Sequence, residues 1–423
     1  MLEKIGRIFS VKEIRNKVLF VLGILVIFRI AANVPIPAVN TEELRSFFDS
    51  NQLFGMLDLF SGGGLKNISI IMLGVGPYIT SSIIMQLMTM IFPQLEQLYK
   101  EEGEAGRQKF NMWTRYLAVP LAAMQSFAMI SLFKTQGILG DLSHFDYVMV
   151  IVTATAGTIF LMWLGELITE KGLGNGVSLI IFAGIVSGLP GAVKQLMLTY
   201  DPTMILTYLS FVGISLVTVA AIVFITEGQR DIPVSFARRI RGGRALGGNS
   251  SSLPLRVNQA GVIPIIFAMS IMVFPRLTAN FFASSSNEVV AKIASKVADI
   301  FANQGFYGIC YFVLVVMFTY FYTAVTFDPK NVAEGLQRQG GFIPGIRPGV
   351  PTMEYLNKVV NRITLFGALF LGLVAVLPYI IQSMTKVSNL TIGGTGILIV
   401  VSVVVEIIKQ IQAQLVMRDY DQL

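Results

Sequence analysis

The chain has very few side chains that support covalent or metal chemistry. Its one cysteine, Cys310, lies inside an apolar run, and its one histidine, His144, lies in an expected loop. Metal sites and proton relays need several such side chains close together. The glycine-rich stretch 172–177, Gly-Leu-Gly-Asn-Gly-Val, lacks the Lys-Ser/Thr pair of a phosphate loop. The sequence therefore predicts no catalytic set, no bound cofactor and no metal site, and we expect that the protein is not an enzyme.

Ionisable residues are also rare inside the apolar runs. Arg29, Glu166 and Glu406 all fall near the ends of such runs, where long side chains reach the membrane surface. Coupled transporters usually carry ionisable groups deep in the membrane, and no TVGYG-like ion filter is present. This pattern favours a passive conduit closed by apolar side chains. A secondary transporter of small solutes is the alternative.

The elements that would position such a conduit are membrane helices. Of the 423 residues, 54% are hydrophobic and only 13% are charged, about half the charged fraction of soluble domains. Apolar runs near 20 residues match the thickness of a bilayer, and within hydrocarbon they must be helical. The sequence predicts an all-α integral membrane protein with ten spans, at 18–34, 71–92, 113–133, 148–168, 175–191, 204–226, 258–275, 305–327, 363–382 and 394–415.

The basic residues indicate which side each loop occupies. With the N-terminus placed in the cytoplasm, 23 of the 32 Lys and Arg residues fall on the cytoplasmic side and nine on the other. This bias agrees with the positive-inside rule and an even number of spans. Both termini are therefore expected in the cytoplasm.

Three connecting segments are unusual. Loops 227–256 and 328–362 are longer than most connections, and both are predicted on the cytoplasmic side, where they form either a docking platform or ordinary solvated loops. Segment 52–70 is apolar, yet it is too short and too rich in glycine to span. It is either a short surface helix or a non-spanning segment enclosed by protein.

Several ordered motifs resemble one known family. They are 60–65 (Phe-Ser-Gly-Gly-Gly-Leu), 73–87 (Leu-Gly-Val-Gly-Pro-Tyr-Ile-Thr-Ser-Ser-Ile-Ile-Met-Gln-Leu), 102–107 (Glu-Gly-Glu-Ala-Gly-Arg), 113–116 (Trp-Thr-Arg-Tyr), 172–185, 227–230 (Glu-Gly-Gln-Arg), 253–264 and 342–349. Together they resemble the SecY/Sec61-alpha family, the central channel subunits of the Sec protein translocon, in its bacterial form.

The resemblance implies an hourglass channel in the bacterial cytoplasmic (inner) membrane. Its two pseudo-symmetric halves would be residues 1–200, with spans one to five and a re-entrant plug helix at 55–67, and residues 201–423, with spans six to ten and both long loops. Unfolded secretory polypeptides would cross the membrane through the channel, and hydrophobic segments would leave sideways into lipid between the second and seventh spans.

The resemblance also assigns site residues. A ring of aliphatic side chains would close the waist, at Ile79, Ile83, Val177, Ile181, Ile266 and Ile399, with Leu398 as a substitute for the last. Residues 79/83 and 177/181 are i, i+4 pairs on one helical face. The plug would seal the outer side under this ring with Leu57, Leu59, Phe60, Gly62, Gly63, Gly64 and Leu65, the glycines providing hinge freedom.

The remaining implied sites are a lateral gate and a docking surface. Thr80 and Gln86 in the second span, and Asn258 and Gln259 opening the seventh, would make gate closure reversible. Arg347 in a tight Gly-Pro loop, with Arg238, Arg239, Arg241 and Arg244, would bind partners; for these last four, ordinary positive-inside bias is an equal explanation. The implied partners are the small membrane subunits SecE and SecG, the motor ATPase SecA, the ribosome, signal sequences and membrane lipids.

Overall fold

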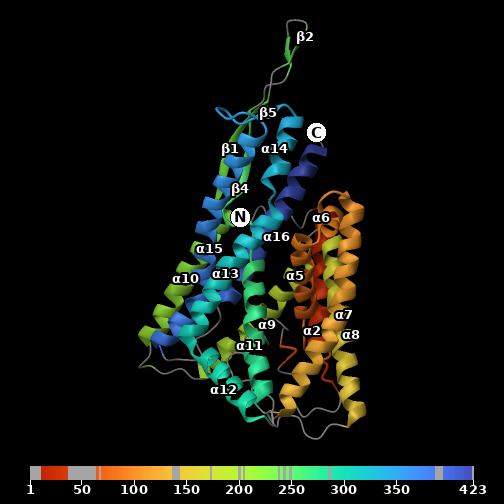
Figure 1. Cartoon of the computed structure of the whole chain (residues 1–423), viewed down its shortest axis with the longest axis vertical. Helices are drawn as coiled ribbons and strands as arrows, with labels where there is room; N and C mark the ends of the chain where they lie inside the picture. The colour runs from red at the N-terminus through yellow and green to blue at the C-terminus, as the bar shows by residue number, and fades with distance from the viewer. Residues whose placement is uncertain are drawn as a thin grey trace.

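The structure is a computed structural model of the chain, and most of it is helical. It describes residues 11–36, 63–65, 68–135, 143–171, 174–198, 202, 205–236, 239–241, 244–246, 250–283, 287–385 and 394–421. The helices lie roughly along one long axis, and a small sheet with a thin hairpin extends beyond one end of the bundle (Figure 1).

Six helices are described before residue 200. They are α2 (Lys12–Ala32), α5 (Gly76–Ile91), α6 (Pro93–Lys100), α7 (Gly103–Thr135), α8 (His144–Glu170) and α9 (Gly176–Leu198). Proline in the first turn fits the start of α5 and of α6, where the missing N–H has no helical acceptor. α5 begins five residues later than the expected span at 71–92, because residues 70–75 form turns in which Gly74 has a φ of 58°.

Seven helices are described after residue 200. They are α10 (Ile205–Glu227), α11 (Ile263–Ala283), α12 (Glu288–Ala302), α13 (Gln304–Thr326), α14 (Pro329–Arg338), α15 (Val350–Thr385) and, at the end, α16 (Gly394–Asp421). Asn303 caps α13 by accepting hydrogen bonds from the N–H groups of Gly305 and Phe306. Asp328 caps α14 by accepting from Lys330 N at 3.0 Å.

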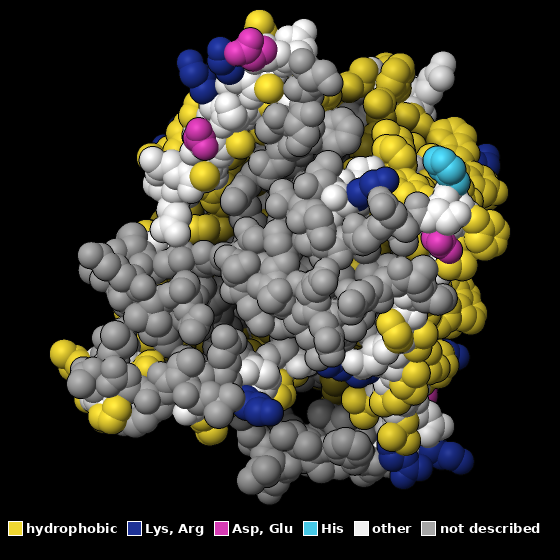
Figure 2. Space-filling view, turned by 90° about the horizontal axis from the view of Figure 1, so that it is seen from below, with side chains coloured by type: hydrophobic (Ala, Val, Ile, Leu, Met, Phe, Trp, Pro, Cys, Tyr) yellow, Lys and Arg dark blue, Asp and Glu magenta, His cyan; other side chains and the backbone are white. Residues whose placement is uncertain are grey.

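Ten of these helices overlap the ten expected spans, although several boundaries differ; α7, for example, begins at Gly103 rather than 113. α11 begins at Ile263 rather than 258, because 258–262 form a turn closed by Gly261 at a φ of 63°. α15 begins at Val350, well before the expected 363. Five helical segments are long and apolar enough to cross a bilayer by length and composition. Figure 2 views the bundle from the end away from the sheet. Hydrophobic side chains make up most of the described surface along one side of this view.

The two long connections are folded, which corrects their prediction as loops. β1 (Gln229–Phe236) pairs antiparallel with β4 (Ser250–Arg256), and β5 (Gly341–Phe342) from the second connection pairs with the other edge of β1. β2 (Arg239–Arg241) and β3 (Arg244–Leu246) form the protruding hairpin. The sheet packs on α15 through a cluster that includes Ile232, Leu255 and Leu356. One small structural unit therefore joins both connections.

The main hydrophobic core runs through the centre of the helical bundle. It contains side chains from α2, α8, α9, α11, α13, α15 and α16. A second cluster joins α7 and α8 to the residues that precede α5. Because α9 packs on α16 and α5 packs on α11, the central core lies where the two predicted halves meet.

Candidate functional site

The expected ring residues come from four helices that meet in the central core. Ile181 in α9, Ile266 in α11 and Ile399 in α16 are buried members of one cluster, and Ile79 in α5 and Val177 in α9 pack against it. Ile83 is also buried, 4% exposed, but is not among the members of that cluster. Leu398 and Ile399 are both buried, so burial does not choose between them.

The orientation of α5 follows from a polar contact on its other side. Ser81 is fully buried, and its hydroxyl donates a 2.6 Å hydrogen bond to the backbone carbonyl of Thr114 in α7. Residues two apart on a helix point about 200° from each other. Since Ser81 faces α7, Ile79 and Ile83 are turned away from α7 and toward the bundle interior.

The start of α9 is fixed against the end of α8 by two glycines. A Cβ built on Gly176 would lie 1.8 Å from the carbonyl oxygen of Gly165, so only glycine permits this approach. Thr169 joins the same two residues, because its hydroxyl accepts from Gly176 N and donates to Gly165 O, both at 2.9 Å. Val177 and Ile181 are therefore held in place by the first turn of their own helix.

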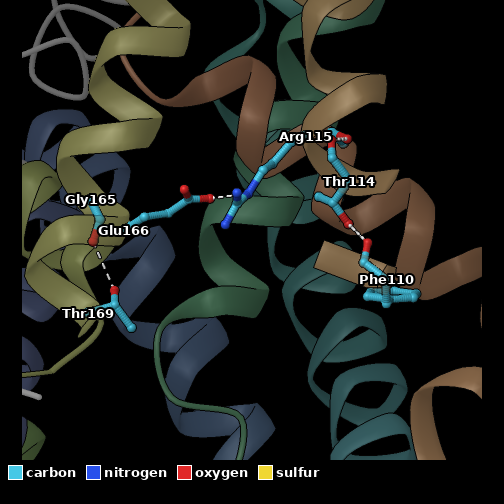
Figure 3. A network of polar contacts seen from close by, with 7 residues as sticks. Phe110, Thr114, Arg115, Gly165, Glu166 and Thr169 are labelled. Atoms are coloured by element: carbon cyan, nitrogen blue, oxygen red, sulfur yellow. Dashed lines mark hydrogen bonds and ion pairs between the residues drawn. The ribbon is translucent and has the colours of Figure 1, made fainter. Parts of the chain in front are cut away.

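An ion pair within the bundle was missed by the sequence analysis. Arg115 Nε in α7 lies 2.5 Å from Glu166 Oε1 in α8, and the two side chains point toward one another between the helices (Figure 3). Glu166 was expected to reach the membrane surface instead. One basic and one acidic residue in neighbouring apolar runs were the available signal for this pair, since charges inside membranes usually pair. The contact ties α7 to α8 next to the Thr169 and Gly165 bond.

The expected gate residues, unlike Arg115 and Glu166, include buried polar atoms that have no partner among the described residues. α5 packs against α11, and the amide oxygens of Gln86, Asn258 and Gln259 are all buried without a hydrogen-bond partner among the described residues. Asn258 Nδ2 does donate to Gly261 O at 3.1 Å, and Gln86 Nε2 to Ser82 Oγ at 3.4 Å. Thr80 donates to Gly76 O within α5. Asn258 and Gln259 precede α11 rather than open it, which corrects their predicted position.

Of the expected plug residues, only Gly63, Gly64 and Leu65 are described; Leu57, Leu59, Phe60 and Gly62 lie outside the described residues. Gly63 has a left-handed φ of 82°. Leu65 is buried in the second cluster, with Ile130, Phe133 and Val150 of α7 and α8. It therefore packs beside these helices and not within the cluster that holds the ring residues. Residues 68–70 bond to 34–36, through Ile36 N to Ile68 O and Ile70 N to Val34 O.

Arg347 occupies the tight loop that the sequence predicts. The loop lies between Gly345 and Gly349, with φ values of 83° and 97°, and Thr352 Oγ1 donates to Arg347 O at 2.9 Å. Ile343 and Ile346 anchor the loop in the sheet cluster, while Arg347 is exposed. Arg239 and Arg241 lie in β2 and Arg244 in β3; their side chains, and all of Arg238, lie outside the description.

The arrangement suits a barrier better than a binding pocket. Aliphatic side chains have no directional hydrogen bonds, so a cluster of them excludes water and ions without selecting a partner. Ile185 in α9, buried beside Gly396 of α16, belongs to the same cluster and was not predicted. Its position one turn beyond Ile181 in an i, i+4 series was the signal for it.

Comparison with known sequences gives consistent matches. A family model described as SecY matches residues 69–408. A relative named protein translocase subunit SecY, from Streptomyces scabiei, is 42% identical over 439 residues, covering 100% of this chain and 99% of the relative. The protein of the same name from Mycobacterium tuberculosis is 41% identical over 430 residues, covering 97% of this chain and 96% of its own length.

Comparison with solved structures gives the same fold. A structure described as that of a protein conducting channel aligns with a TM-score of 0.62 at 20% identity, covering 94% of this chain and 91% of the other. Sec61 in a canine ribosome-channel complex from the endoplasmic reticulum aligns with a TM-score of 0.60 at 19% identity, with the same coverage. At such identities the likeness shows the fold alone, a bundle of ten membrane-spanning helices.

Proposed function

The chain belongs to the SecY family, and from that premise we propose that polypeptide crosses the membrane through the aliphatic ring between its two halves. As a member of this family the chain is a protein-conducting channel subunit, not an enzyme and not a transporter of small solutes. The observation that carries the proposed path is the joining of Ile79, Val177, Ile181, Ile266 and Ile399 in one cluster.

The ring acts as a seal that does not recognise sequence. At rest the aliphatic side chains pack together and exclude water; during transport they separate and surround the moving chain. Because apolar side chains grip every sequence alike, the path accepts many substrates. Residues 55–67 act as a plug on the outer side of the ring, and the left-handed backbone of Gly63 supports a hinge at the end of that segment.

The gate between α5 and α11 opens laterally toward lipid. A buried amide oxygen without a partner costs about 1–3 kcal/mol, so the unpartnered oxygens of Gln86, Asn258 and Gln259 weaken the closed state. A signal sequence that inserts between the helices, or water that enters with it, supplies partners or relieves their burial. A ligand that favours the open form in this way shifts the population toward it.

The sheet and the Arg347 loop receive partners on the cytoplasmic face. A solved structure with the same fold is described as Sec61 in a ribosome-channel complex, and a basic exposed surface suits an acidic protein or ribosomal RNA. We assign SecA and the ribosome to this face, SecE and SecG to the sides of the bundle, and the whole assembly to the bacterial cytoplasmic membrane with both termini inside. The two halves, 1–200 and 201–423, move against each other as the gate opens.

The path is tested by crosslinking to a polypeptide stalled in transit. In a Cys310→Ser background, Ile181→Cys should form a disulfide with a cysteine placed in the stalled segment. Ile180→Cys is the matched control, since it is equally buried on the same helix but faces about 100° away. Equal crosslinking from both positions, or none from either, would remove the proposed path.

The docking surface is tested by charge reversal. Arg347→Glu should abolish motor-driven translocation in reconstituted vesicles while leaving insertion and thermal stability unchanged, because the side chain is exposed. Arg338→Glu is the control, because that arginine is exposed nearby and is occupied by Glu334 at 3.2 Å. If Arg347→Glu supports normal translocation, partner docking does not depend on this loop.

A further inference from the structure

A cleft opens where the sheet meets the helical bundle. It has a volume of about 540 Å³ and is lined by Gln229, Arg230 and Asp231 of β1 and by Arg362, Ile363 and Phe366 of α15, among others. The described lining contains no residue of the ring or of the Arg347 loop, although Val257, which also lines the cleft, directly precedes the gate residue Asn258. Its lining combines two guanidinium groups, a carboxylate and apolar side chains.

The cleft lies where the protein surface changes from polar to apolar. Arg362 and Phe366 are one turn apart on α15, and the exposed side chains that continue along the helix, Leu369 and Leu373, are apolar. Phe366 is 61% exposed. On α10, exposed Phe224 lies one turn before Gly228, where the chain leaves the helix toward β1. Such a border is the level at which lipid headgroups contact a membrane protein.

The two arginines of the cleft are not held by direct ion pairs within the described part of the chain. Arg230 and Arg362 are exposed, and neither has an ion pair or hydrogen bond among the described residues. By contrast, Lys409 near this end of the bundle is paired with Glu227 at 3.0 Å. Guanidinium groups bind phosphate oxygens through two parallel hydrogen bonds, so two of them around one cleft suit a phosphodiester.

The carboxylate in the lining narrows the choice of headgroup. With Asp231 included, the two arginines leave the cleft with one net positive charge, which one phosphodiester neutralises. A carboxylate also accepts hydrogen bonds from hydroxyl groups. We propose that this cleft binds the headgroup of an anionic, hydroxyl-bearing glycerophospholipid: Arg230 and Arg362 hold the phosphodiester, Asp231 accepts from the hydroxyl, and an acyl chain lies along Phe366.

Lipid retention measured by native mass spectrometry tests the proposal. The full chain, purified with the subunits that accompany it, is titrated with phosphatidylglycerol or phosphatidylcholine. Phosphatidylglycerol should be retained about fivefold more strongly, since the cleft has one net positive charge and one basic residue near a bilayer surface favours anionic lipid by about this factor. The double variant Arg230→Gln/Arg362→Gln should lose this preference. Lys358→Gln, which removes a charge one turn away on the same helix, should keep it.

Two further arms separate the possible sources of the anion. Millimolar inorganic phosphate should not displace the bound lipid, because phosphate lacks the acyl chain. Phosphatidylmethanol, which has the same charge but no hydroxyl, should bind less well than phosphatidylglycerol, and Asp231→Asn should remove that difference. Displacement by inorganic phosphate, equal retention of both titrated lipids, or undiminished preference in the double variant would each overturn the proposal, the last by showing that the lipid binds elsewhere on the protein.

Discussion

The two sides of α5 differ in how they are held. On the side facing α7, Ser81 makes a short hydrogen bond to Thr114, and α7 is joined to α8 by Arg115 and Glu166. We call the contacts among α5, α7, α8 and the start of α9 the wall. Gln86 in α5, and Asn258 and Gln259 just before α11, have amide oxygens that are buried without partners among the described residues, and α5 also packs against α11. We call the α5–α11 contact the seam.

This difference shows how one helix can belong to both a fixed and a movable contact. Satisfied polar groups and glycine contacts hold the wall in one arrangement, because separating them costs free energy. Unsatisfied groups make the closed seam less stable than its packing alone would make it. We therefore expect α5, which carries the proposed ring residues Ile79 and Ile83, to stay with the wall when the seam opens.

The largest expected effect is at the closest contact of the wall. Gly176→Ala places a methyl group on the carbonyl oxygen of Gly165 and should lower the free energy of unfolding by about 3 kcal/mol or more. Thermal unfolding in detergent measures it. Gly191→Ala in the same helix meets nothing within 4 Å, and should be neutral or stabilising by up to about 1 kcal/mol. Similar losses of unfolding free energy in both variants would mean that the close approach of Gly176 to Gly165 does not account for the effect.

A change on each side of α5 should have opposite signs. Ser81→Ala removes the hydroxyl that bonds to Thr114 and should destabilise the protein by about 1 kcal/mol. Gln86→Leu replaces an amide whose oxygen lacks a partner, and should stabilise the closed form by about 1–3 kcal/mol while slowing translocation. Unfolding and transport assays on both variants test the contrast. Loss of stability in both would show that the seam is held like the wall.

The smallest expected effect is the coupling between Arg115 and Glu166. Polar contacts between membrane helices contribute about 1 kcal/mol, and Arg115 is 45% exposed, which weakens the pair further. A double-mutant cycle with Arg115→Gln and Glu166→Gln should give a coupling of about this size in the unfolding free energy. A coupling near zero would mean that this ion pair does not hold the wall, and that other contacts, such as the glycine approach and the Ser81 bond, do so.

Much of the helical architecture is predictable from the sequence, because apolar length and charge bias are properties of single segments. The positions of all ten spans follow from them, and the tight turn at Arg347 follows from its glycines and prolines. The start of α15 at Val350 does not follow, because its first turns are polar and become helical by packing against the sheet.

Contacts between distant segments are less predictable. Nothing in residues 227–256 or 341–342 alone shows that β5 pairs with β1, since the pairing joins two connections more than 100 residues apart. The pairing of Arg115 with Glu166 depends on how α7 and α8 are rotated. The ring residues were assigned by family resemblance, since isoleucines at helical spacing are otherwise indistinguishable from ordinary core residues.

Ion conductance of the resting channel tests the central claim most directly. Ile83→Gly/Ile181→Gly should make vesicles containing the protein leak small ions, because glycine removes the side chains that close the ring. The control Ile84→Gly/Ile180→Gly deletes the same atoms from the adjacent positions of the same two helices, and should stay closed. If the ring variant remains as tight as the wild-type protein, or if the control leaks equally, these side chains do not form the seal.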